Sequence, residues 1–323
     1  MKRKIILLVT AAWMFCTCTN AQNEPAQAYD PTTTNDTTNV VYVTYDGNSA
    51  SAVVCENIKN LVIITISGAN VRIVQSSQVG LSTGEITYEL TGSSTNGSFY
   101  MEGAYKANVS LRGLTLTNPS GPAIDIQNGK RIEIGIKRDT QNTLADGTST
   151  ALDAWKGALQ CKGHIEFKGY GTLDVYGNYA NAIWAKEYIT VRNCTINVRK
   201  AVKDGINCNQ YFAMESGLIN ISGVADDGIS VGLKNNDTSA ENTGNFTMTG
   251  GTINIDIRGI SGQAVNATGK TSVATTATLN TSWTQGVESI QSSEVSMQKV
   301  VRDGQVVIIR DGKTYNLNGT RID

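Results

Sequence analysis

The sequence has little charge, few aromatic residues and almost no proline or histidine. Charged residues make up 17% of its 323 residues, below the usual share of about a quarter. The formal net charge is −1, so nothing global points to nucleic acid or to an anionic membrane surface as a partner. The only histidine, His164, cannot build a zinc site alone, and no cysteine spacing completes one.

Glycine, threonine, asparagine and isoleucine are abundant instead, and they recur with a period. Segments of similar pattern contain Thr172, Thr195 and Leu218, which are separated by 23 residues each. An isoleucine follows eleven residues after each of these positions. A period in the low twenties, made of short apolar runs and turn residues, indicates stacked repeats in which each repeat is one coil of the chain.

We therefore predict an all-β fold, a right-handed parallel β-helix (a solenoid) over residues 40–270. Each coil should carry two or three short strands that pair in parallel with the neighbouring coils, and strand twist predicts the right hand. Loops inserted around residues 138–151 and 234–245 account for two longer spacings. A leucine-rich repeat or a propeller fits less well, because neither a helical half nor longer antiparallel blades are indicated.

The chain begins with a segment that is typical of a signal peptide, residues 1–21. A basic start is followed by an apolar run from Ile5 to Phe15, which is too short to span a bilayer. Cleavage after Ala21 and lipid attachment at Cys18 both remain open. Either predicts a location outside the cytoplasm, as an outer-membrane lipoprotein or as a periplasmic or secreted protein. Residues 22–39 are expected to be a flexible tether.

Residues 271–323 are expected to form a linker followed by a short β tail. The linker is predicted from a Thr/Ala-rich composition over residues 271–281. Two Asp-Gly pairs, Asp303-Gly304 and Asp311-Gly312, lie between apolar runs and predict a β-hairpin-like tail or a meander. This tail resembles the short C-terminal modules of many secreted Bacteroidetes proteins.

Four cysteines follow the leader segment: Cys55, Cys161, Cys194 and Cys208. The repeat places Cys161 and Cys208 in one column but two coils apart, about 9–10 Å at the spacing of strands. This separation is too long for a disulfide, and Cys194 falls in another column. The sequence therefore predicts buried free thiols that pack as small apolar groups.

One column of the repeat is acidic. It contains Asn181, Asp204 and Asp227, with Asp226 beside the last. Stacked coils are about 4.8 Å apart, so the carboxylates should lie close enough to raise a pKa or to recruit a cation. Calcium, which binds carboxylate and amide oxygens, suits this set. The other interpretation, which stays open, is a ladder of turns in which each Asp or Asn side chain caps its own backbone.

Aromatic residues gather in the turns and strand ends of consecutive coils, where they could stack on the apolar faces of sugar rings. Trp184 falls in the column of Gln160 and Asn207 and is expected to be exposed, and Tyr179 is the other leading candidate. Packing under loops is the alternative role for each ring. The candidate carbohydrate-binding residues are Tyr179, Trp184, Trp155, Tyr176 and Tyr188.

Four segments resemble a known family in order and spacing: residues 121–124, 141–147, 171–179 and 225–229. It is the carbohydrate-binding β-helix family, typified by a clostridial cellulose- and polygalacturonate-binding protein, and the likeness covers residues 40–260. The resemblance implies a right-handed parallel β-helix, bound calcium, and adhesion to plant-type or acidic polysaccharides. The sequence departs at residues 181–184, where Asn-Ala-Ile-Trp stands in place of the family's frequent Asp-Gly-Ile-His.

We expect a noncatalytic protein that binds polysaccharide, of a cellulose or polygalacturonate-like kind, with calcium as its cofactor. The predicted partners include no nucleic acid, and a membrane only through a possible lipid anchor. A calcium-dependent lyase or hydrolase of pectin-like glycans and a structural, adhesin-like solenoid stay as alternatives. The hydrolase is disfavoured because residues 249–251 read Thr-Gly-Gly where polygalacturonases place Gly-His-Gly. A lyase would have Lys203 or Arg199 as its base.

Overall fold

The computed structural model describes residues 32–34, 38–148, 155–234, 242–257, 262–283, 297–302, 305–310, 313–316 and 321–322. The predicted signal peptide lies outside these residues, as does most of the predicted tether. The chain divides into two units, Met1–Trp283 and Thr284–Asp323. Within the described part of the chain, no helix is long and apolar enough to cross a membrane.

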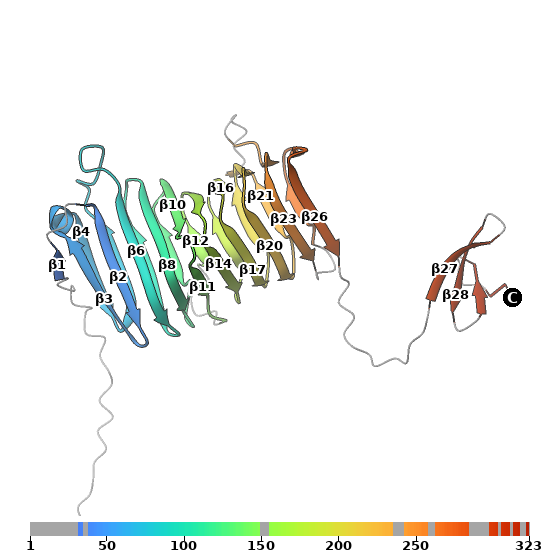
Figure 1. Ribbon diagram of the computed structural model, residues 1–323, viewed down its shortest axis with the longest axis horizontal. Helices are drawn as coiled ribbons and strands as arrows, with labels where there is room; N and C mark the ends of the chain where they lie inside the picture. Colours follow the sequence, from blue (N-terminus) through green and yellow to red (C-terminus); the bar gives the residue numbers. More distant parts are fainter. Residues whose placement is uncertain are drawn as a thin grey trace, which may run out of the picture. The chain divides into compact units, whose positions relative to one another are not determined.

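The first unit is built from two large sheets (Figure 1). One has nine strands, which run in the order β24-β21-β18-β15-β12-β9-β7-β5-β4. These strands are β4 (Val62–Ser67), β5 (Ala69–Gln75), β7 (Gly97–Glu102), β9 (Ile124–Gln127), β12 (Gly157–Cys161), β15 (Asn181–Ala185), β18 (Ile206–Asn209), β21 (Ile229–Gly232) and β24 (Val265–Ala267). One short 3₁₀ helix, η1 (Glu56–Leu61), precedes β4.

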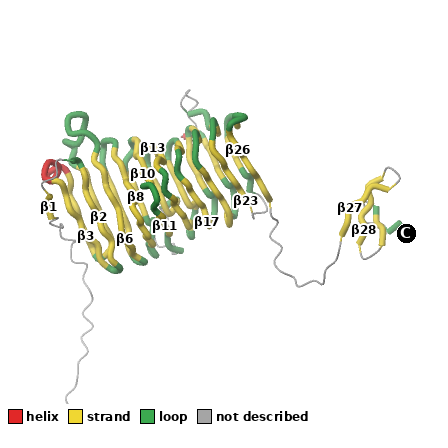
Figure 2. Tube along the Cα trace, viewed as in Figure 1, coloured by secondary structure: helices red, strands yellow, loops and turns green. Residues whose placement is uncertain are grey.

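The other sheet has 17 strands; Figure 2 shows strands in yellow along the whole length of the first unit. Its strands are β1 (Thr32–Thr34), β2 (Val40–Asp46), β3 (Ser49–Cys55), β6 (Ile86–Ser94), β8 (Ala107–Thr117), β10 (Arg131–Ile136), β11 (Gln141–Ala145), β13 (His164–Gly169), β14 (Thr172–Gly177), β16 (Ile189–Arg192), β17 (Thr195–Ala201), β19 (Tyr211–Met214), β20 (Leu218–Val224), β22 (Asn245–Met248), β23 (Gly251–Ile257), β25 (Thr271–Val273) and β26 (Ala277–Trp283).

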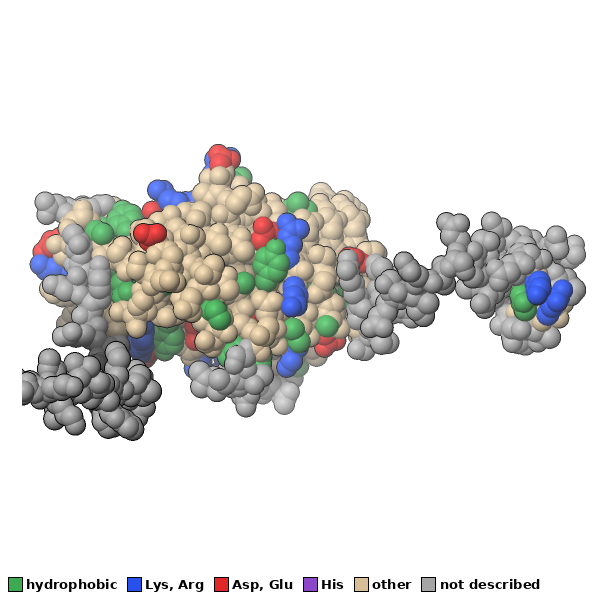
Figure 3. Space-filling model, turned by 90° about the horizontal axis from the view of Figure 1, so that it is seen from below, with side chains coloured by type: hydrophobic (Ala, Val, Ile, Leu, Met, Phe, Trp, Pro, Cys, Tyr) green, Lys and Arg blue, Asp and Glu red, His purple; other side chains and the backbone are tan. Residues whose placement is uncertain are grey.

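Alternation of apolar and polar residues explains why these segments are strands. In β10, Ile132, Ile134 and Ile136 are fully buried, whereas the residues between them are partly exposed. The buried side chains of both sheets form one continuous core. On the face seen in Figure 3, charged and hydrophobic side chains are scattered among backbone and other side chains.

The predicted 23-residue register is confirmed in the second half of the unit. Ile183 of β15 pairs in parallel with Ile206 of β18, which pairs with Ile229 of β21. The predicted second column is also present, through β13, β16, β19 and β22. Each repeat contributes one strand to the nine-stranded sheet and two to the 17-stranded sheet.

The prediction of an all-β chain is confirmed, but the prediction of a right-handed parallel β-helix is wrong. The strands do not form separate columns of short parallel strands throughout, because β8, eleven residues long, pairs with both β10 and β11 and merges two columns into the 17-stranded sheet. Antiparallel hairpins, β2–β3 and β4–β5, also begin the two sheets. The architecture is therefore a large mixed sheet with a second, nine-stranded sheet.

The long strands bend where the columns merge. Between β6 and β8 the pairing register shifts after Leu90, so that Gly92 lies opposite Leu114. Gly92 has a φ of +88°, and a Cβ atom there would lie 2.0 Å from the carbonyl oxygen of Tyr45. Only glycine fits this close approach in the left-handed region.

Two further segments differ from the sequence predictions, whereas the cysteines agree with them. Residues 271–281, predicted to be a linker, instead supply β25 and most of β26, which pair with β22 and β23. Part of the predicted insertion at 138–151 is β11, which pairs with β8 and β14. All four cysteines, Cys55, Cys161, Cys194 and Cys208, are free and buried, as predicted.

The second unit contains a three-stranded antiparallel sheet. Its strands are β27 (Met297–Arg302), β28 (Gln305–Arg310) and β29 (Lys313–Tyr315). The predicted β-hairpin-like tail is thus confirmed as a meander. The Asp-Gly pairs that motivated it lie outside the described residues.

Candidate functional site

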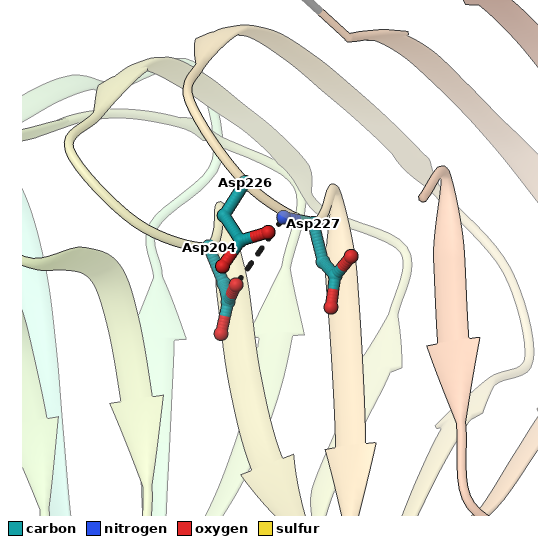
Figure 4. A group of neighbouring side chains, drawn as sticks. All are labelled: Asp204, Asp226 and Asp227. Atoms are coloured by element: carbon teal, nitrogen blue, oxygen red, sulfur yellow. Dashed lines mark hydrogen bonds between the residues drawn. The ribbon is translucent and has the colours of Figure 1, made fainter. Parts of the chain in front are cut away.

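Three carboxylates meet where two neighbouring strands of the nine-stranded sheet begin. Asp204 precedes β18, and Asp226 and Asp227 precede β21. One oxygen atom from each side chain lies within 4.8 Å of the others. Figure 4 shows the carboxylate of Asp226 directed toward Asp204, while Asp227 lies on the adjacent strand. The stacking that brings these strands together follows from the 23-residue repeat.

Hydrogen bonds connect this column from one repeat to the next. The Asp204 backbone N–H donates to Oδ1 of Asn181 over 3.1 Å, and the Asp227 N–H donates to Oδ1 of Asp204 over 3.2 Å. The Gln263 N–H continues the column by donating to Oδ1 of Asp227 over 2.8 Å. Each side chain therefore caps the backbone of the following repeat, not its own backbone as in the predicted ladder of turns.

Side-chain amides contact the remaining oxygens. Asn207 Nδ2 donates to Oδ2 of Asp204, and Asn266 Nδ2 donates to Oδ2 of Asp227, both over 2.7 Å. The sequence analysis identified neither residue as part of the acidic site. Their signal was available, because each is the second residue of its strand, β18 or β24, and follows an apolar residue.

Burial and like charge act together on this cluster. Asp204 and Asp227 are 8% and 6% exposed, whereas Asp226 is exposed. Burial raises the pKa of Asp204, and the charges of Asp227 and Asp226 raise it further, against the lowering effect of the hydrogen bonds from Asn207 and the Asp227 N–H. Within the described residues, Lys203 forms no ion pair with these carboxylates; its backbone carbonyl accepts from the Asp226 N–H.

The donor set fits a hard divalent cation. Each hydrogen-bonded oxygen of Asp204 and Asp227 accepts one N–H and keeps a second lone pair, and the exposed Asp226 adds a third carboxylate. Calcium takes about six to eight oxygen ligands, including water, which this partly open site allows. Asn181, predicted to contribute either an amide oxygen or an indirect contact, accepts the Asp204 backbone N–H at Oδ1 and donates from Nδ2 to the Lys156 carbonyl. It positions Asp204.

Trp184 lies on the same sheet as the acidic cluster. It pairs with Gln160 of β12 and Asn207 of β18, the column that the sequence predicted, and it is partly exposed. The same outward column continues through Ser230 to Asn266. Because Asn207 and Asn266 bind the carboxylates of Asp204 and Asp227, the column and the acidic cluster form one surface, which we call the Trp184 face.

The column of Trp184 continues in register toward the N-terminal hairpins through Gln160, which is only 6% exposed. Tyr100 of β7 pairs with Asp125 of β9, which pairs with Gln160. The guanidinium of Arg72 lies 4.8 Å from the centre of the Tyr100 ring. Tyr100 was not among the predicted binding residues. Its position between the buried residues Phe99 and Met101 predicts that it faces outward.

Trp155 is not available to stack on a sugar. Its side chain is only 4% exposed, its ring centre lies 4.3 Å from that of Tyr179, and its Nε1–H donates to Oδ2 of Asp146 over 3.2 Å. Burial raises the pKa of Asp146 to about 6, although hydrogen bonds from Asn178 and Trp155 lower it. Trp155 is therefore part of the packing around a buried carboxylate, and it covers one side of the partly exposed Tyr179.

Tyr188, in the connection from β15 to β16, belongs to a stack of rings with His164 and Tyr211, the first residues of β13 and β19. Its ring is parallel to that of Tyr211, with centres 4.6 Å apart, and lies 4.1 Å from the His164 ring. Since His164, Tyr188 and Tyr211 belong to consecutive repeats, the faces of Tyr188 are covered by protein. Tyr176 is 37% exposed but belongs to β14 of the 17-stranded sheet. The structure thus brings Trp184 to the acidic cluster and leaves Tyr188 and Tyr176 elsewhere.

Comparisons with known proteins place this surface in context. A sequence model of the carbohydrate-binding domain-containing proteins matches residues 67–320. The chain matches none of the curated proteins. A solved structure, the polysaccharide lyase-like protein from C. thermocellum in a gadolinium derivative, is similar with a TM-score of 0.59 and 20% identity, over 74% of this chain and 99% of that chain. At this identity the similarity is one of fold.

Proposed function

Because the chain belongs to the family of carbohydrate-binding domain-containing proteins, we propose that it is a noncatalytic polysaccharide-binding protein. Its ligand would be a plant-type or acidic glycan of a cellulose or polygalacturonate-like kind. The observation that carries this proposal is the Trp184 face. There an accessible indole lies in a column of amide and hydroxyl side chains, beside three clustered carboxylates.

The periodicity of the Trp184 face suits a linear polymer. Equivalent side chains on neighbouring strands are about 4.8 Å apart, which is similar to the length of one sugar residue in an extended chain. Trp184 can cover the apolar face of a sugar ring, while Asn207 and Asn266 offer hydrogen-bonding groups on following strands. Tyr100 lies three strands from Trp184 along the same column and would offer a second aromatic contact.

Calcium is proposed at the acidic cluster. Asp204, Asp226 and Asp227 would hold it, and Asn181 would position Asp204. When bound, the ion would neutralise the carboxylates and could accept oxygen atoms from an acidic sugar as further ligands. Without a cation, the negative cluster would repel an acidic glycan.

Two basic side chains that an enzyme could use form ion pairs with other residues, which supports a noncatalytic role. His164 Nε2 is 2.6 Å from a Glu187 carboxylate oxygen, and Arg199 Nε is 2.9 Å from Asp174. In the part of the chain that the structure describes, neither forms an ion pair with the acidic cluster. Lys203, the other candidate base, meets the cluster through its backbone.

The location proposed for the protein follows from its leader. A cleaved signal peptide would make it periplasmic or secreted, and lipid attachment at Cys18 would hold it on the outer membrane. Both would place the Trp184 face where extracellular glycans are available.

A glycan array probed in calcium and in chelator tests the proposal, combined with an assay for new unsaturated or reducing ends. We expect binding to plant-type or acidic polysaccharides that is weaker in chelator, with no new ends formed. Depolymerisation of polygalacturonate that is lost in Asp204→Ala would contradict the noncatalytic role. Binding to no glycan would contradict the proposed function and favour an adhesin with a protein partner.

A further inference from the structure

A second surface, on the 17-stranded sheet, has the features of a binding site. A depression of about 340 Å³ crosses the outer face of strands β6, β8, β10 and β13. No residue of the Trp184 face contributes to it. Its floor is made by Ser110 and Gly135, and its rim carries Lys137, Arg138 and Tyr170.

The depression exists because Gly135 has no side chain. Gly135 lies between Ser110 of β8 and Lys168 of β13 in the register of the sheet. A Cβ atom at this position would meet nothing closer than 4.0 Å, and the backbone is not in the left-handed region. The fold therefore does not require glycine here, and its presence leaves space on the surface.

Ser110 provides an unsatisfied polar group at the bottom of this space. Its side chain is 4% exposed, and its hydroxyl has no hydrogen-bond partner in the described part of the protein. A buried hydroxyl without a partner is unfavourable, but this oxygen is not accessible from the depression, so a ligand would gain a hydrogen bond with it only if neighbouring side chains shift. Asn108 lies two residues before Ser110 on the same face of β8, and it adds an amide.

The rim is basic and aromatic. Three basic side chains line the depression, Lys137, Arg138 and Lys168, against one acidic side chain, Glu133. Lys168 is neutralised by Glu133, with Nζ 2.8 Å from a carboxylate oxygen, which leaves Lys137 and Arg138 in excess. The Arg138 guanidinium lies 4.2 Å from the centre of the Tyr170 ring, which is 57% exposed.

We infer that this depression is a second glycan subsite that binds a sugar residue carrying an acidic group, without calcium. The acidic group would lie beside Lys137 and Arg138, and the sugar ring against Tyr170. This inference rests on the proposed function and adds to it, because the Trp184 face is negatively charged and this surface is positively charged. Carboxylated and sulfated sugars share the required chemistry.

Two variants and a control test the inference by titration calorimetry in chelator. Gly135→Thr fills the depression with a residue that favours strands, and the double variant Lys137→Gln, Arg138→Gln removes the excess charge. Thr247→Val, at an outward position of β22 outside the depression, is the matched control. The probes are an oligogalacturonate, a sulfated galactan oligosaccharide and a neutral cello-oligosaccharide, and unfolding midpoints check that each variant folds.

We expect the wild type to bind at least one acidic probe in chelator, with affinity that falls as salt rises. Each of the two test variants should lose at least tenfold in that affinity, while Thr247→Val and the binding of the neutral probe stay unchanged. The acidic probe that binds identifies the acid group. If Gly135→Thr does not fold, the double variant decides.

Acidic probes that bind equally to the wild type and to both test variants would overturn the inference. If they bind only with calcium, and binding is lost in Asp227→Ala but kept in Gly135→Thr, the inference fails while the proposed function stands. If no glycan binds the wild type with or without calcium, both fail.

Discussion

Two columns of short polar side chains run along the same stack of strands, and their chemistry separates them. On the 17-stranded sheet, Asn197, Asn220, Asn254 and Asn280 lie on consecutive strands. Each amide donates to the oxygen of the preceding one over 2.8 Å, and the first donates to Asp174. On the nine-stranded sheet, the corresponding column is Asn181, Asp204 and Asp227.

The difference lies in what each side chain can donate. An amide carries both a donor and an acceptor, so stacked asparagines satisfy one another without charge. A carboxylate only accepts, so the aspartate column draws its donors from backbone N–H groups and from Asn207 and Asn266. The amide column also ends on a carboxylate that Arg199 neutralises, whereas charge accumulates in the aspartate column. The same stacking therefore gives a self-contained ladder in one place and, in the other, the cluster of carboxylates that we propose as a cation site.

The largest effect on stability is expected at Asp146, a buried carboxylate that belongs to neither column. It therefore shows the effect of burial without the charge of neighbouring carboxylates. Its pKa is raised from 3.8 to about 6 by burial, so its contribution to stability is complete below about pH 4 and is lost as the pH rises through 6. The free energy of unfolding should fall by roughly 3 kcal/mol over this range relative to Asp146→Asn. Urea unfolding from pH 3.5 to 7.5 measures it, and calcium should not alter the difference.

A parallel pH dependence of the wild type and Asp146→Asn would contradict this account of the Asp146 environment. Trp155 fluorescence offers a direct control, because its indole N–H donates to Asp146. Its emission should change with a midpoint near pH 6.

Calcium should stabilise the protein through the aspartate column. At a hundredfold excess over its Kd, an ion that binds only the folded state adds about 2.7 kcal/mol to the free energy of unfolding. Asp227→Ala should lose most of this gain, whereas Asp174→Ala, the matched change in the amide column, should keep it. Thermal unfolding in calcium and in chelator measures both, and equal gains in the two variants would contradict the assignment.

Replacing one asparagine of the amide column by aspartate should make the amide column resemble the aspartate column. Asn220→Asp replaces the donor that faces Oδ1 of Asn197 by an acceptor, and should cost about 2 kcal/mol at pH 7. Protonation restores a donor, so the loss should shrink as the pH falls toward 4. The same change at exposed Asn280 is the control and should cost less. Urea unfolding that shows no loss at pH 7 would refute the role given to the amide hydrogen bonds.

The smallest effect is expected at the neutralised end of the amide column. Arg199→Gln removes the ion pair with Asp174, whose side chains are 46% and 23% exposed, and should cost about 0.5 kcal/mol. The loss should disappear in high salt, because exposed pairs are screened. A loss that persists in high salt would mean that Arg199 acts by packing.

The repeat made much of the site predictable. Since 23 residues separate equivalent positions, the sequence placed Asn181, Asp204 and Asp227 in one column and Trp184 beside Gln160 and Asn207, and the structure has both arrangements. The all-β class was predicted correctly, but the arrangement of its strands as a right-handed parallel β-helix was not. The N-terminal third has no 23-residue repeat, and its long strands and antiparallel hairpins join columns that the repeat alone presents as separate.

The exposure of the aromatic side chains was the other property that the spacing of the repeat could not predict. Trp155 and Tyr188 were candidates because of where they fall along the chain, but their faces are covered by Tyr179 and by His164 and Tyr211. Such contacts depend on how loops and neighbouring repeats pack. The depression over Gly135 was missed for a related reason, since it results from the absence of one side chain on a sheet whose register was unknown.

Equilibrium dialysis against calcium tests the central claim, that the aspartate column is a cation site, most directly. The wild type should bind one calcium ion more per chain than the double variant Asp204→Asn, Asp227→Asn, which keeps the shape of both side chains but removes their charge. The same calcium uptake by the two proteins would show that the column is a hydrogen-bonded ladder alone.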